Sequence, residues 1–261
     1  MKAGRSLLRD LRGLGQTRAP ATIAPAVLER LGLTEAYAAV ETAIGRVWVV
    51  FKGDTVRALR RAASAAAFEA AFRREFGRPV RAAEALPAPL AAGLRQALAG
   101  GDARGVRFDL GGLSPFEQAV LRKALEVPAG QVRTYAWVAR EIGRPAAVRA
   151  VGSALGRNPI PLLIPCHRIV RSDNRISDYI FGPDVKRALL AGEGVDPAGL
   201  ERLASSGVRY VGSDTTKIYC FPTCRAARRI TERHRVPFRS ERHATGAGYR
   251  PCRLCRPAVA S

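Results

Sequence analysis

The chain has 261 residues, 47% of them hydrophobic, which is enough for two or three small domains with ordinary cores. No apolar run approaches about 18 residues, so we expect no membrane-spanning helix, and the basic first residues lack the apolar stretch of a secretory signal. The 43 Lys and Arg residues outnumber the 22 Asp and Glu residues, which gives a formal net charge of +21. This surplus reflects either many solvated arginines or a polyanionic partner such as nucleic acid.

The first two segments of the chain differ in pattern. Residues 1–35 are basic and contain prolines, which predicts a loosely attached leader. Residues 36–109 predict an α+β or α/β scaffold domain, because short β-rich runs precede two helical patterns. The expected strands cover 36–41, 46–51 and 55–60, and the expected helices cover 65–76 and 88–99.

Residues 110–194 predict a second, mainly helical unit that opens with a capping box at Ser114-Pro115-Phe116-Glu117. Two short helices over 135–142 and 145–156 are typical of a helix-turn-helix, although a plain helical hairpin has the same pattern. A stretch punctuated by prolines follows, and a last helix is expected over 183–191. Residues 195–206 have the composition of a linker.

The five cysteines divide into one isolated residue, Cys166, and four near the C-terminus. An odd number argues against a disulfide framework, and free thiols suit a reducing compartment, so we expect a cytoplasmic protein. Cys166 follows Pro165 and precedes His167 and Arg168, whose side chains favour the thiolate. Glu193 is a candidate to orient His167 as a base. A buried inert cysteine, a hydrolase nucleophile and a group-transfer nucleophile all remain possible from this pattern.

The C-terminal segment, residues 207–261, has too few apolar residues for a self-sufficient core. Its cysteines form two short-spaced pairs, Cys220-x3-Cys224 and Cys252-x2-Cys255. Together they predict one tetrahedral site with four sulfur ligands, which suits Zn²⁺ better than an iron–sulfur cluster. Because four thiols suffice, His234 and His243 are predicted to be surface residues.

The sequence around Cys166 resembles a known family. NPIPLLIPCHRIV, preceded by TYAWVAREIGRPAAVRAVGSALGR, is similar to the O6-alkylguanine-DNA alkyltransferases over 110–195, and more weakly over 36–109. The resemblance implies an RNase H-like N-terminal domain and a winged-helix-like helix-turn-helix domain. It also implies a DNA-repair protein that moves the alkyl group of O6-methylguanine irreversibly to its own cysteine, acting once as a monomer on duplex DNA.

Carried over by position, the resemblance makes Cys166 the alkyl acceptor. His167 would take its proton through a water, Glu193 would orient His167, and Asn158 would hold the turn beside the thiol. Two further residues would act on DNA. Tyr135 would crowd the phosphate of the target nucleotide and Arg149 would fill the gap left by the flipped base.

One loop departs from this family pattern. SDNRISDYIFGPDVK keeps Tyr179 but places Ile180 and Phe181 where small residues are common. We expect these side chains to narrow the pocket, so that methylguanine is accepted and benzyl-sized adducts react more slowly. The altered loop also motivates an alternative function, a lesion sensor that binds alkylguanine in DNA without transfer.

DTTKIYCFPTCRAARR and ATGAGYRPCRLCRP resemble the metal-binding domain of the bacterial Ada protein over 208–257. The resemblance implies that Cys220 is both a zinc ligand and the acceptor of methyl groups from DNA phosphotriesters, although a purely structural zinc module is the simpler reading. The arginines expected to contact phosphates are Arg225, Arg228, Arg229, Arg250 and Arg253. No AraC-type reader is recognised in the chain, so we expect no sequence-specific transcriptional activation.

Overall fold

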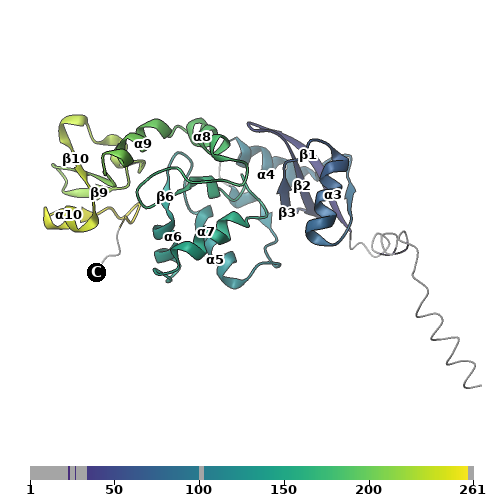
Figure 1. Ribbon diagram of the computed structural model, residues 1–261. Helices are drawn as coiled ribbons and strands as arrows, with labels where there is room; N and C mark the ends of the chain where they lie inside the picture. The colour runs from purple at the N-terminus through teal and green to yellow at the C-terminus, as the bar shows by residue number, and fades with distance from the viewer. Residues whose placement is uncertain (1–22, 24–26, 28–33, 100–102, 258–261) are drawn as a thin grey trace, which may run out of the picture.

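The computed structural model describes residues 23, 27, 34–99 and 103–257, so most of the expected leader lies outside the described residues. The chain is a mixed α/β protein whose parts follow one another in a row (Figure 1). An N-terminal sheet lies at one end, a mainly helical segment occupies the middle, and a small four-stranded module lies at the other end. Among the described residues, no helix is long and apolar enough to cross a membrane.

The N-terminal sheet has five strands in the order β4-β1-β2-β3-β5. β1 (Glu35–Thr42), β2 (Gly45–Lys52) and β3 (Thr55–Arg60) lie where the sequence predicts strands. They pair as an antiparallel meander. β4 (Val80–Ala82) and β5 (Arg107–Phe108) add parallel strands at the two edges. Alternate residues of β2 point to opposite faces, so each face carries its own layer of apolar side chains.

Two helices cover these faces. α3 (Ala65–Phe76) is capped by Ser64, ends at Gly77 in a left-handed conformation, and packs Phe68 against Trp48. α4 (Ala88–Leu98) packs against the opposite face. That second layer is continuous with the core of the middle segment, so the sheet and the middle segment share one hydrophobic core.

The middle segment contains four helices and a short parallel strand pair. α5 (Pro115–Leu125) begins with the predicted capping box, in which Ser114 and Glu117 bond reciprocally. The next helices are α6 (Tyr135–Glu141), capped by Thr134, α7 (Val148–Gly156) and α8 (Pro183–Gly192). α7 begins three residues after the expected start because Ala147 closes a turn on Arg144. β6 (Arg133–Thr134) pairs with β7 (Ile169–Val170), which follows the 3-10 helix η2 (Cys166–Arg168).

The expected linker is a packed helix, α9 (Pro197–Ser205). Asp196 caps it by accepting a hydrogen bond of 2.8 Å from the Gly199 amide, and Pro197 occupies the first turn. Leu200 and Ala204, four residues apart, are buried on one face. The Asp-Pro start and the four-residue spacing of Leu200 and Ala204 both indicate a helix. The linker prediction is wrong because it relies on the polar composition of the segment alone.

The C-terminal module is a small sheet in the order β10-β8-β9-β11. Its strands are β8 (Tyr210–Ser213), β9 (Ile218–Cys220), β10 (Arg235–Phe238) and β11 (Arg250–Pro251), with α10 (Glu241–Gly246) beside them. The buried side chains on one face form a cluster of only four residues, Tyr219, Phe238, Ala244 and Tyr249. Other buried residues of the module, such as Val211, Phe221 and Ala227, belong to the core that is shared with the middle segment. The module therefore has little apolar core of its own, as its composition predicts.

Candidate active site and metal centre

Cys166 begins a tight 3-10 turn at the end of the stretch punctuated by prolines. The prolines and Leu162, whose φ is 72°, keep the chain out of regular structure before the turn. The Cys166 amide then donates to the Ile164 carbonyl at 2.8 Å. The side chain is 6% exposed, so the thiol lies just beneath the surface.

Asn158 connects this turn to the thiol. Its Nδ2 donates to the Ile164 carbonyl at 3.0 Å and to Cys166 Sγ at 3.1 Å, and its Oδ1 accepts from the Ile160 amide at 3.0 Å. The side chain is completely buried. One amide therefore fixes the backbone of the turn and the direction of the Cys166 side chain together.

Burial raises the pKa of the Cys166 thiol, and the Asn158 hydrogen bond and the Lys186 charge oppose that effect. The sequence suggests that the neighbouring Arg168 favours the thiolate, but the structure corrects this. The Arg168 guanidinium donates to Glu193 and to the Val127 carbonyl instead. The thiol therefore needs a base to remove its proton at neutral pH.

His167 and Glu193 meet as the sequence predicts, with 2.9 Å between His167 Nε2 and Glu193 Oε1. Burial would raise the pKa of Glu193, but hydrogen bonds from His167 and Arg168 lower it to about 2. Because an ionised carboxylate only accepts, Nε2 carries the ring proton and Nδ1 is the free acceptor. Nδ1 is buried and has no partner in the described part of the chain. Burial lowers the pKa of His167, which keeps the ring neutral at pH 7.

A cavity of about 410 Å³ opens onto the thiol. It brings together the predicted residues Cys166, Tyr135, Tyr179 and Ile180. Phe181 does not line it, contrary to the expectation that its bulk narrows the pocket. Its ring packs edge-on against Tyr179, with centroids 5.6 Å apart, and lies under the Arg61 guanidinium of the N-terminal domain.

Arg149 is exposed near the start of α7 and does not line the cavity. It lies three and seven residues before Gly152 and Gly156, which do line it. Residues at this spacing share one face of a helix. Arg149 therefore belongs to the same face of α7 as the cavity wall, one turn further out.

A polar network beside the cavity escapes the sequence analysis. Lys186 is buried and donates to the Ile169 carbonyl at 2.6 Å and to Ser177 Oγ at 2.9 Å. Ser177 Oγ is also 2.7 Å from the Tyr135 hydroxyl. Burial lowers the pKa of Lys186 to about 8. Sequence shows only a lysine on an amphipathic helix, which is normally a solvated residue.

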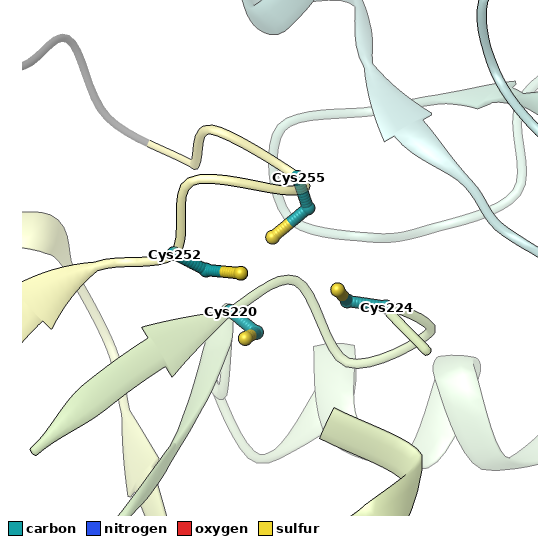
Figure 2. Close-up of side chains that lie close together, drawn as sticks. All are labelled: Cys220, Cys224, Cys252 and Cys255. Carbon is teal, nitrogen blue, oxygen red and sulfur yellow. The ribbon is translucent and has the colours of Figure 1, made fainter. Parts of the chain in front are cut away.

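The four C-terminal cysteines converge, as their spacing predicts (Figure 2). β9 and β11 pair in parallel with Tyr219 opposite Pro251, which places Cys220 beside Cys252 at the ends of the two strands. Cys224 and Cys255 lie in the turns that follow and point back toward them. All four sulfur atoms lie within 4.8 Å of one another, all four residues are buried, and none is in a disulfide.

This donor set fits Zn²⁺. Four buried thiols at this separation can surround one tetrahedral ion, with Zn–S bonds of about 2.3 Å. His234 pairs with Asp214 at 2.8 Å, and neither it nor His243 belongs to the cluster. A zinc ion would also stabilise a module whose own core is small.

An arginine-rich cleft of about 910 Å³ lies against this centre. Its lining includes Cys220 and Cys252 together with four arginines, Arg225, Arg229, Arg250 and Arg253. Arg228 is different from these four. Its guanidinium donates to the Gly130 carbonyl of the middle segment and does not line the cleft.

Comparisons with known proteins match the middle segment and the C-terminal module to two different families. Residues 115–195 match the model of the 6-O-methylguanine DNA methyltransferase DNA-binding domain, and residues 202–258 match the metal-binding domain of Ada. A methylated-DNA–protein-cysteine methyltransferase of Methanosarcina barkeri is 47% identical over 75 residues, 29% of this chain and 48% of the relative. One from Mycobacterium bovis is 44% identical over 85 residues, 33% of this chain and 51% of the relative. The chain thus spans about half the length of the curated relatives it matches.

Among solved structures, the Mycobacterium tuberculosis O6-methylguanine methyltransferase matches with a TM-score of 0.52 at 29% identity, over 65% of this chain and 99% of that one. The M. tuberculosis OGT in complex with DNA matches with a TM-score of 0.50 at 29% identity, over 61% of this chain and 93% of that one. The chain therefore joins a DNA-binding domain of the 6-O-methylguanine DNA methyltransferase family to a metal-binding domain of the Ada family.

Proposed function

We propose that this protein repairs alkylated DNA by moving the alkyl group of O6-methylguanine to Cys166 in a single irreversible turnover. The observation that carries the proposal is the Cys166 thiol at a cavity of about 410 Å³, held by Asn158, with a neutral His167 backed by an ionised Glu193. The relatives that share this segment are methylated-DNA–protein-cysteine methyltransferases.

The chemistry follows from the protonation states. His167 Nδ1 takes the Cys166 proton through a water, and Glu193 stabilises the resulting imidazolium. The thiolate attacks the alkyl carbon, an S–C bond forms, and the bond between that carbon and O6 breaks. The guanine leaves with the electron pair and takes up a proton from solvent, and the His167 imidazolium releases the proton that came from Cys166. The thioether is stable, so the molecule acts once.

The target base has to leave the duplex, because a thiol in a recessed pocket cannot reach O6 inside the base stack. We assign this step to α6 and α7 as a helix-turn-helix of winged-helix type. Tyr135 on the cavity wall crowds the phosphate of the target nucleotide. Arg149, one turn further out on α7, fills the gap in the stack. The surplus positive charge supplies affinity for duplex DNA.

In the C-terminal module, Cys220, Cys224, Cys252 and Cys255 would hold one Zn²⁺ ion. When bound, this ion keeps the sulfur atoms as thiolates. Cys220 adjoins the arginine-rich cleft, so a phosphotriester held by Arg225 or Arg250 would reach the acceptor sulfur. The module would thereby bind DNA and remove methyl groups from backbone phosphotriesters.

The proposed organisation has an RNase H-like N-terminal domain over 36–109, the alkyltransferase domain over 110–194 and the zinc module over 207–261, with 195–206 between the last two. We propose that the protein acts as a monomer in the cytoplasm. Nothing in this organisation calls for a second copy to complete either thiol site.

The test is peptide mass spectrometry of zinc-loaded protein incubated with methylated duplex DNA. Wild type should gain the mass of one methyl group in place of a proton on the Cys166 peptide, and Cys166→Ser should not. A second gain on the Cys220 peptide, absent in Cys220→Ser, would establish phosphotriester repair. An unmodified Cys166 in protein that still binds the lesion would replace the alkyltransferase with a lesion sensor.

A further inference from the structure

One contact between the C-terminal module and the alkyltransferase segment is made by an arginine close to the cysteine cluster. Arg228 lies in the 3-10 helix η3 (Ala227–Arg229), and its backbone amide donates to the Cys224 carbonyl at 3.1 Å. Its guanidinium reaches across the interface to the Gly130 carbonyl. Arg228 therefore connects the loop of a cysteine ligand to the middle segment of the chain.

Gly130, which accepts this hydrogen bond, also contacts the Glu193 carboxylate that orients His167. The Gly130 amide donates to Glu193 Oε2 at 3.2 Å. Gly130 has φ of 72°, and a side-chain carbon there would lie 2.7 Å from the Glu193 carbonyl and 3.2 Å from Arg228 Nη2. Only glycine fits between these two groups.

We propose that the cysteine module is a positioning part of the alkyltransferase site, in which Arg228 holds the Gly130 residue and that residue holds Glu193 against His167. This inference rests on the proposed function, because it assigns Glu193 and His167 to the removal of the Cys166 proton. Arg228 is the positioning residue, since it acts through Gly130 and touches none of the reacting atoms.

A second set of contacts fixes the same loop independently. Arg133 is 3% exposed and has no carboxylate partner among the described residues. Its guanidinium donates to Val132 and Gln131 and lies 5.5 Å from the ring centre of Phe221 in the module. The Phe221 ring is therefore one of the groups of the module that hold this guanidinium in place.

The backbone beside Arg133 is also tied to the module. The Val132 amide donates to Thr223 Oγ1 at 2.9 Å, in a buried position next to Cys224. The segment 130–133 is therefore held by the module at three successive points. The module determines where this segment lies, and the segment reaches Glu193.

The test measures how readily Cys166 loses its proton, without DNA. Zinc-loaded full-length protein is treated with iodoacetamide over a range of pH, and alkylation of the Cys166 peptide is followed by mass spectrometry. The variants are Arg228→Gln, Arg228→Lys, which keeps a donor for Gly130, and Arg242→Gln. Arg242 is an exposed arginine of the same module whose side chain makes no hydrogen bond within the described residues.

In Arg228→Gln, we expect alkylation at pH 7 to slow about three- to tenfold, the range that one lost hydrogen bond of ordinary strength allows. The pH midpoint should rise by about half to one unit, because a less firmly held Glu193 makes His167 a weaker base. All charged and titratable groups that face Cys166 and His167 are unchanged in these variants: Glu193, Arg168, Lys186, Tyr135, Tyr179 and Asp178. Arg228→Lys should recover most of the rate, and Arg242→Gln should match wild type.

A double-mutant cycle separates positioning from general damage to the module. In a Glu193→Gln background, Arg228→Gln should change neither the rate nor the midpoint, while zinc content stays at the wild-type level. The proposal is overturned if Arg228→Gln behaves like Arg242→Gln, or if it has the same effect with and without Glu193. Methyl transfer from DNA is measured in parallel. Its absence in wild type would remove the proposed function and leave the iodoacetamide comparison intact.

Discussion

Replacing Glu193 with glutamine should show how much folding free energy the carboxylate contributes. Its side chain is 11% exposed and binds both His167 and the Arg168 guanidinium, whose side chain is 10% exposed. The pKa of Glu193 is about 2, against an ordinary 4.5, which corresponds to about 3 kcal/mol of stability. Loss of one partner from a buried ion pair costs about 3–5 kcal/mol. We therefore expect Glu193→Gln to lower the free energy of unfolding at pH 7 by about 3 kcal/mol.

The pH dependence separates loss of charge from loss of packing. A carboxyl whose pKa is lowered by folding stabilises the protein fully above its unfolded pKa, and this contribution disappears as the pH falls through the folded value. The difference between wild type and Glu193→Gln should therefore be constant above about pH 5 and shrink between about pH 4.5 and 2.

The assay is urea unfolding followed by the fluorescence of Trp137, in a Trp48→Phe background that leaves one tryptophan. Glu126→Gln is the control, because the Glu126 side chain is 51% exposed. Its two partners, Lys123 and Arg256, each keep a second carboxylate, that of Glu141. Glu126→Gln should cost less than about 1 kcal/mol at any pH. A Glu193→Gln penalty that stays the same from pH 7 to pH 3 would refute the electrostatic reasoning.

Three further predictions concern the pocket and the metal. Asn158→Ala should raise the pKa of Cys166 further and slow its alkylation by iodoacetamide at pH 7, because the 3.1 Å hydrogen bond to Sγ is lost; an unchanged pH profile would contradict this. Wild type should react faster with methylguanine than with benzylguanine in DNA. Ile180→Gly should reduce this difference in rate more than Phe181→Gly does, because Ile180 lines the cavity and Phe181 does not. Equal effects of the two variants in transfer assays would show that the cavity wall is assigned wrongly. Treatment with a zinc chelator, or Cys255→Ser, should lower the zinc content measured by atomic absorption and make the C-terminal module sensitive to proteolysis. A module that resists protease without metal would show that apolar packing is enough to keep it folded.

Local signals in the sequence predict most of the fold. The helix that begins after Ser64 and ends at Gly77, and the capping box at Ser114, lie where their side-chain chemistry places them. Such signals act over three or four residues, so they survive in any tertiary setting. The four-cysteine cluster is predicted for a related reason, because two short-spaced pairs leave few ways to satisfy four thiols.

The contacts that escape prediction join residues far apart in the chain. Arg168 appears from its position to serve Cys166, yet its guanidinium turns to Glu193, 25 residues away. Arg228 appears to be one of several DNA-contacting arginines, yet it bonds to Gly130. A long charged side chain can reach several partners, and only the docking of helices and loops decides among them. The burial of Lys186 is hidden for the same reason.

The contacts that dock the C-terminal module join residues that are synthesised at different times. Gly130 leaves the ribosome 98 residues before Arg228, and Val132 leaves it 91 residues before Thr223. At about 5–20 residues per second, translation takes about 5–20 seconds to cover such a distance. A nascent chain can therefore complete the turn around Cys166 while the residues that brace Gly130 are still untranslated. Cys166 itself precedes Arg228 by 62 residues, so for about 3–12 seconds a growing chain carries the thiol before Arg228 has been added.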